Sequence, residues 1–129
     1  MGTRISLSDG EWKLMNLLWD HAPRTIMELV HALEADTGWT KHTVIKMLSR
    51  MEEKGAVRYE EGARAKQYYP AARRKAVALE ETENFLRKVY GGSLGLMMSA
   101  MVEDKGLSQA ELEELHAILS QAEEHCDDA

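Results

Sequence analysis

The sequence predicts a mainly α-helical protein of the α+β class, in which an N-terminal winged helix-turn-helix with a small β-hairpin wing precedes a helical dimerisation domain. Three observations support this. The N-terminal part has helix patterns that begin with N-capping residues. A hairpin pattern rich in β-forming residues follows, and the remaining sequence is helical with long apolar faces. We expect residues 1–72 to form the winged-helix domain and residues 73–129 to form the dimerisation domain.

The N-terminal half contains helix patterns that are expected over residues 9–22, 26–34 and 41–54. Each helix follows a residue whose side chain can accept a hydrogen bond from an unpaired backbone N–H group: Ser8, Thr25 and Thr40. Glu11 and Glu28 stand three residues after the first two caps and complete capping boxes. Gly55 ends the third helix, and Asp36-Thr37-Gly38 is expected to be the turn before it.

A β-hairpin is expected after the third helix, because residues 57–59 and 67–69 are rich in valine and tyrosine. A charged segment with Gly62 forms the tip between the strands, and Pro70 ends the second strand. We interpret the tyrosines of the second strand as packing residues and not as a surface for base stacking. Helix, helix-turn-helix and hairpin in this order are the winged-helix arrangement.

Three more helices are expected over residues 74–90, 94–102 and 109–124, with glycine breaks between them. The middle helix is apolar on nearly all sides, so another surface must bury it. The last helix has leucines at alternating spacings of three and four, which is the seam of two packed helices. Because so short a segment cannot enclose a good core alone, we expect a homodimer held by Phe85, Leu86, Val89, Leu94, Met97, Met98, Met101, Leu112, Leu115 and Leu119.

The net charge of −6 hides a separation of charge along the chain. Residues 1–75 carry 13 of the 16 lysines and arginines and 10 of the 22 aspartates and glutamates, whereas residues 76–129 carry 3 and 12. Residues 40–75 alone have a net charge of +6. A basic segment can approach a polyanion and an acidic one cannot, so double-stranded DNA is the expected partner of the N-terminal part.

The third helix is the candidate for reading DNA, since the second helix of a helix-turn-helix motif approaches base edges in the major groove. Its apolar residues at helical spacing are expected to face the core: Val44, Met47, Leu48 and Met51. The opposite side presents Ile45 among polar and basic residues. We expect DNA contacts from the helix residues Thr40, Lys41, His42, Thr43, Lys46, Ser49 and Arg50, and from the wing residues Arg64 and Lys66.

A basic helix face also has a simpler explanation as a solvated surface. Glu52 and Glu53 weaken that explanation, because they lie apart from the basic first half, whereas a face made only for solubility usually mixes its charges. In the wing, Glu60 and Glu61 favour an ordinary charged turn, since acids oppose phosphate. Arg73-Arg74-Lys75 is interpreted as a third DNA contact or as the start of the long helix.

The sequence gives no sign of catalysis, of a cofactor or of a metal site. It lacks a Ser-His-Asp set and a glycine-rich phosphate loop. His125 and Cys126 are adjacent, so they cannot share one helix face, and a closed metal site needs about four ligands. The single cysteine agrees with a reducing compartment, and no stretch resembles a membrane span or a signal peptide, so a cytoplasmic location is expected.

Several motifs follow one another in a specific order and spacing. In the N-terminal half they are Glu11-Trp12, Met15-Asn16-Leu17-Leu18-Trp19-Asp20, Thr43-Val44, Leu48, Arg50-Met51 and Lys54-Gly55. In the C-terminal half they are Phe85-Leu86, Tyr90-Gly91-Gly92, Leu107-Ser108 and Glu113-Glu114-Leu115. Together they resemble the penicillinase repressor family, which contains regulators of the BlaI, MecI and CopY type, and the resemblance covers nearly the whole chain.

This resemblance implies a winged-helix repressor that dimerises through its C-terminal helices and binds inverted repeats with TACA and TGTA half-sites. It implies that residues 40–54 are the recognition helix and that residues 58–69 are the wing. Two departures concern the inducing signal. The Asn-Phe bond that is cut in antibiotic-responsive members corresponds to Ala100-Met101, and the Cys-x-Cys motifs of copper-responsive members are absent. We expect a protease or an effector to relieve repression at residues 93–107, and not metal at Cys126.

Two alternatives remain open from the sequence. One is a metal-responsive repressor of the copper type. The other is a winged-helix adaptor that binds proteins and not DNA. An adaptor has no need of a basic recognition helix and a basic wing tip in series, so the charge of +6 in residues 40–75 favours DNA binding.

Overall fold

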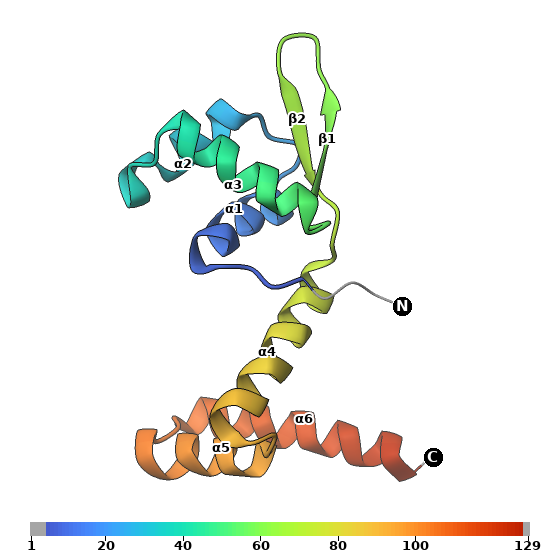
Figure 1. Ribbon diagram of the computed structural model, residues 1–129. Helices are drawn as coiled ribbons and strands as arrows, with labels where there is room; N and C mark the ends of the chain where they lie inside the picture. The colour runs from blue at the N-terminus through green and yellow to red at the C-terminus, as the bar shows by residue number, and fades with distance from the viewer. Residues whose placement is uncertain (1–4, 128–129) are drawn as a thin grey trace. The chain divides into compact units, whose positions relative to one another are not determined.

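The computed structural model describes residues 5–127 and divides into two compact units, with the boundary between Thr82 and Glu83. The first unit contains helices α1 (Asp9–Asp20), α2 (Ile26–Thr37) and α3 (Lys41–Glu53), followed by strands β1 (Val57–Glu61) and β2 (Lys66–Pro70) (Figure 1). The two strands pair antiparallel, with Tyr59 opposite Tyr68. This order of elements confirms the predicted fold class.

The second unit contains the end of helix α4 (Arg74–Tyr90), then α5 (Leu94–Ala100), a π-helix labelled η1 (Met101–Lys105), and α6 (Gln109–Asp127). The predicted single helix over residues 94–102 therefore changes type after Ala100. Gly106 ends the π-helix with a φ of 84°, a backbone conformation that glycine adopts without strain. Within residues 5–127, no helix combines the length and hydropathy needed to cross a membrane.

Helix α2 is three residues longer than predicted, because residues 35–37 continue the helix instead of forming a turn. Gly38 caps it in the left-handed conformation, with a φ of 66° and its N–H bonded to the carbonyl of Glu34 at 3.0 Å. The Thr37 hydroxyl donates to the Leu33 carbonyl at 3.0 Å and stabilises the same turn. The start of this helix agrees with the prediction, since Thr25 and Glu28 form the expected capping box.

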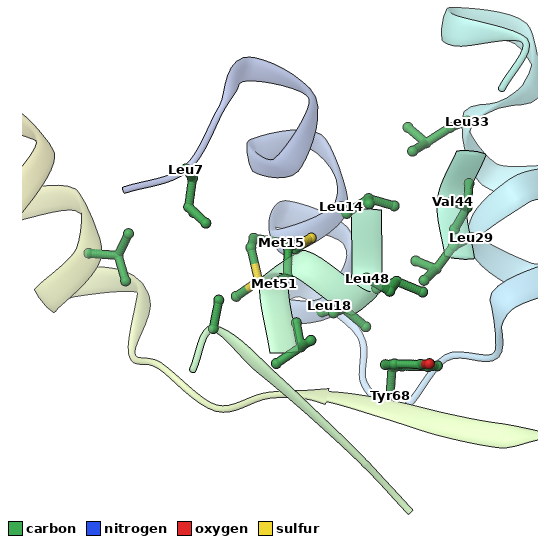
Figure 2. Packing of buried hydrophobic residues seen from close by; sticks show 13 residues of the cluster. Leu7, Leu14, Met15, Leu18, Leu29, Leu33, Val44, Leu48, Met51 and Tyr68 are labelled. Atoms are coloured by element: carbon green, nitrogen blue, oxygen red, sulfur yellow. The ribbon is translucent and has the colours of Figure 1, made fainter. Parts of the chain in front are cut away.

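One hydrophobic core holds the first unit together (Figure 2). Its largest fully buried side chains come from α1, α2 and α3: Leu14, Met15, Leu18, Leu29, Val44, Leu48 and Met51. The prediction for α3 is therefore correct, with Met47 half-buried at the margin of the core. Tyr68 of β2 is 6% exposed, which confirms that it is a packing residue.

The wing is joined to the helices through Arg24, in the segment between α1 and α2. The Tyr68 N–H donates to the Arg24 carbonyl at 2.8 Å, and the Arg24 N–H donates to the Tyr68 carbonyl at 3.2 Å. The Arg24 guanidinium also donates to the carbonyls of Leu17 and His21, near the end of α1. These bonds fix the base of the wing against the end of α1.

The first turns of α4 belong to the first unit and pack against its core. The Trp19 indole N–H donates to the Ala72 carbonyl at 2.9 Å, and Val77 is buried in the core. Arg74 donates to the Asn16 side chain at 3.3 Å and lies 5.8 Å from the centre of the Trp19 ring. Residues 73–75 were interpreted either as a DNA contact or as the start of the long helix. Arg74 is the first residue of α4, as the second interpretation predicts.

Candidate nucleic-acid interface

Helix α3 separates its residues into a buried face and an exposed face. The exposed residues include almost all of the predicted DNA contacts: Thr40, Lys41, His42, Lys46, Ser49 and Arg50. Thr43 is half-buried. Its hydroxyl lies 3.1 Å from the hydroxyl of Thr40, which also accepts a hydrogen bond from the Thr43 N–H at 3.2 Å. The helix thus presents three cationic or ionisable side chains and two hydroxyl groups in its first two turns.

The far end of α3 is fixed by an ion pair that the sequence did not reveal. Lys54, the C-cap residue, donates from its Nζ to Glu11 Oε1 at 2.6 Å and to the Ser6 carbonyl at 2.8 Å. The Glu11 side chain is only 5% exposed and also accepts from the Ser8 N–H at 2.9 Å. Burial alone would raise the pKa of Glu11, but the hydrogen bonds and the charge of Lys54 hold it below its ordinary value.

Gly10 of α1 is in close contact with the residue before the N-cap of α3 and with the middle of that helix. Gly10 lies under the side chains of Trp39 and Met47, and an added Cβ at this glycine would come within 2.9 Å of the Met47 terminal methyl group and 3.1 Å of the Trp39 ring. The missing side chain lets both residues pack against α1. Residues of α1 therefore contact the segment before the candidate recognition helix, the middle of the helix and its C-cap residue.

The predicted wing cations differ in their surroundings. Lys66 is half-buried, and its Nζ lies 4.1 Å from the centre of the Tyr59 ring; the electrostatic interaction with Tyr59 raises the pKa of Lys66. Arg58 lies 4.2 Å from the centre of the Tyr69 ring and pairs with Glu60 at 2.9 Å. The charge of Glu60 is thus balanced within the strand. Arg64 is exposed near the tip, between the two strands.

The second unit exposes large apolar side chains along each of its elements. Among the described residues 83–126, none is buried in the single chain. Four predicted dimerisation residues are exposed by 48–59%: Phe85, Val89, Leu94 and Leu119. The other six are half-buried: Leu86, Met97, Met98, Met101, Leu112 and Leu115. The prediction did not include Leu96, Val102 and Ile118, which are 60%, 45% and 54% exposed.

An apolar groove of about 430 Å³ lies within the second unit. Aromatic rings, methionines and leucines form most of its wall: Phe85, Tyr90, Met97, Met98, Met101, Leu107 and Leu115. Cys126 is exposed in the last turn of α6. In the described part of the chain, no three His, Cys, Asp or Glu residues are grouped as metal ligands would be.

Comparisons with known proteins give consistent matches. Residues 7–121 match the sequence model of a family described as "Penicillinase repressor". The penicillinase repressor of Bacillus licheniformis is 30% identical over 119 residues, covering 92% of this chain and 91% of the relative. The methicillin resistance regulatory protein MecI of Staphylococcus aureus (strain N315) is 27% identical over 114 residues, covering 88% and 93%.

A solved structure extends the likeness to the first unit. The Bacillus licheniformis BlaI monomer, determined in complex with the blaP half-operator, superimposes with a TM-score of 0.51 at 27% sequence identity. The match covers 58% of this chain and 92% of that chain. The solution structure of the DNA-binding domain of the repressor BlaI gives the same TM-score and covers 57% and 90%.

Proposed function

The chain belongs to the penicillinase repressor family, and from this we propose that it represses transcription in the cytoplasm by binding an inverted-repeat operator as a homodimer. The exposed face of α3 carries the proposal, because basic and hydroxyl side chains gather there, opposite the face that packs in the core. The relative from Bacillus licheniformis whose fold matches this unit was solved on a half-operator.

We assign base readout to α3 and phosphate contacts to the wing. Side chains in the first turns of α3 have the donors and methyl groups that distinguish base pairs in the major groove: Thr40, Lys41, His42, Thr43, Lys46, Ser49 and Arg50. Arg64 is exposed near the wing tip, and Lys66 keeps its charge beside Tyr59. Both cations suit phosphate contacts, which position a protein on DNA without reading its sequence.

A second copy of this chain is the occupant that we propose for the apolar surface of the second unit. The unit has no buried residue among those described and exposes seven large apolar side chains beyond residue 83: Phe85, Val89, Leu94, Leu96, Val102, Ile118 and Leu119. Large apolar side chains that are exposed along every element of one unit are typical of an interaction surface. A homodimer also suits an inverted repeat, whose symmetry mirrors a two-fold protein.

DNA affinity should fall steeply with salt. If a dimer makes roughly 6–10 phosphate contacts, the affinity is expected to drop about 10³–10⁵-fold between 50 and 200 mM salt. Titration of a fluorescent duplex at several salt concentrations measures this slope. Arg64→Ala should reduce the slope and weaken selected and random duplexes alike.

Substitutions on α3 can distinguish residues that read the base sequence from residues that only position the protein on DNA. Thr43→Ala and Lys46→Ala should weaken binding to a selected palindrome more than binding to random DNA, because base contacts specify and phosphate contacts position. Ser120→Ala, in the exposed part of α6, serves as the control and should change neither affinity. Equal losses on both duplexes for Thr43, Lys46 and Arg64 would contradict the assignment of α3 as the reading helix.

A further inference from the structure

Ile45 differs from the other large apolar residues of α3, a helix that lies wholly within the described residues. It is 39% exposed, whereas the others are buried or half-buried: Val44, Met47, Leu48 and Met51. A β-branched residue is also a poor choice for a helix surface that only needs to be soluble, because its side chain is restricted in a helix. A branched apolar side chain exposed at this position is available to contact an apolar group outside the chain.

The neighbours of Ile45 place it within the proposed reading surface. On a helix, side chains three and four positions apart lie next to one another. His42 precedes Ile45 by three positions, Lys41 precedes it by four, and Ser49 follows it by four; all three are exposed. Ile45 is thus an apolar group surrounded by hydrogen-bonding groups, at the part of the helix expected to enter the major groove.

We propose that Ile45 determines part of the DNA sequence preference by packing against the 5-methyl group of a thymine. This inference rests on the proposed function. The major-groove edge of DNA offers donors, acceptors and the thymine methyl group. An isoleucine side chain forms no hydrogen bonds. Of the groups on the major-groove edge, the thymine methyl is therefore the one against which its burial is favourable. Donors from Lys41 or His42 read the adjoining base edges.

The test first selects binding sites from a pool of random-sequence duplexes with the full-length protein. Each thymine of the selected site is then replaced in turn by deoxyuridine, which keeps the base pair and removes only the methyl group. For the unsubstituted protein, one replacement per half-site should weaken binding about fourfold, the value of one buried methyl-sized group. The Ile45→Ala protein should bind the thymine and deoxyuridine duplexes equally.

Met27→Ala provides the matched control. Met27 is an apolar residue of the same unit with a similar exposed fraction of 41%, but it lies on α2. This variant should keep the full response to deoxyuridine. Circular dichroism of each variant checks that the fold is intact, and Ile45→Val should keep part of the response because it retains a branched apolar group.

The outcomes separate the two proposals. A selected site without thymine, or a response to deoxyuridine that is the same in Ile45→Ala, would overturn the role of Ile45 and leave the repressor function standing. If the unsubstituted protein selects no sequence from the pool, the operator-binding function itself is wrong, and the role of Ile45 is wrong with it.

Discussion

Replacing Leu119 by aspartate is expected to dissociate the proposed homodimer and to weaken binding to an inverted-repeat operator by about 10²–10⁴-fold, the usual gain from linking two binding modules. Leu119 is 59% exposed in the single chain, so a carboxylate there remains solvated in the monomer. In the proposed dimer the same carboxylate would lose its water, which is costly without a charged partner. Sedimentation at micromolar concentration and titration of the operator duplex measure the two effects.

Two comparisons make this prediction specific. Ser120→Asp introduces the same charge at the next position of α6, which is also exposed but polar, and should leave the dimer intact. A duplex with a single half-site should bind Leu119→Asp as tightly as it binds the unsubstituted protein, since one winged-helix unit suffices for it. A Leu119→Asp protein that remains dimeric would show that α6 does not form the interface.

Changing Lys54 to methionine is expected to reduce the free energy of unfolding by about 1.5–3 kcal/mol, the range for a hydrogen bond to a charged group. Methionine keeps the length of the side chain, but Glu11 then remains buried without its cationic partner, which is the costly way to break such a pair. The Ser6 carbonyl loses its donor as well. Urea unfolding followed by circular dichroism gives the difference.

A second lysine provides the control for this measurement. Lys13 pairs with Asp36 at 2.7 Å, but the two side chains are 43% and 58% exposed. Exposed pairs contribute at most about 1 kcal/mol, so Lys13→Met should be nearly neutral. Equal destabilisation by Lys13→Met and Lys54→Met would mean that the burial of Glu11 is not what makes its ion pair important.

The same ion pair predicts how stability depends on pH. The pKa of Glu11 is lowered in the folded protein from an ordinary value of 4.5. A carboxyl group with a lowered pKa stabilises the fold above its unfolded-state pKa, and this contribution is lost as the pH falls below about 4.5 through the folded-state value. Unfolding measured between pH 7 and pH 3 should show a smaller acid loss for Lys54→Met than for the unsubstituted protein.

The helix starts could be predicted because the interactions that define them are local. Ser8 with Glu11, Thr25 with Glu28, and Ser108 with Glu111 form reciprocal side-chain to backbone hydrogen bonds within four residues of sequence. The end of α2 was not predicted correctly. The sequence Asp36-Thr37-Gly38 is compatible with a turn and with a helix that ends at a left-handed glycine, and the structure shows the latter.

The periodicity of apolar residues was enough to predict which residues of α3 form the candidate interface. The spacing of apolar residues in α3 determines which side chains face outward, and the structure places them so. The contacts that hold the helix could not be predicted in this way. Glu11 and Lys54 are 43 positions apart, and Trp19 and Ala72 are 53 apart. The sequence predicted only the role of Glu11 in its capping box, although its carboxylate also pairs with Lys54.

The distribution of aromatic residues has an optical consequence. All three tryptophans of the chain lie in the first unit, where the Trp12 and Trp19 rings are 5.8 Å apart and Trp39 packs near Gly10. The second unit carries only Phe85 and Tyr90 as aromatic residues. Tryptophan fluorescence therefore reports the unfolding of the first unit alone, while far-ultraviolet circular dichroism reports the unfolding of both units. Melting curves that separate between the two signals would assign each transition to its unit without any label.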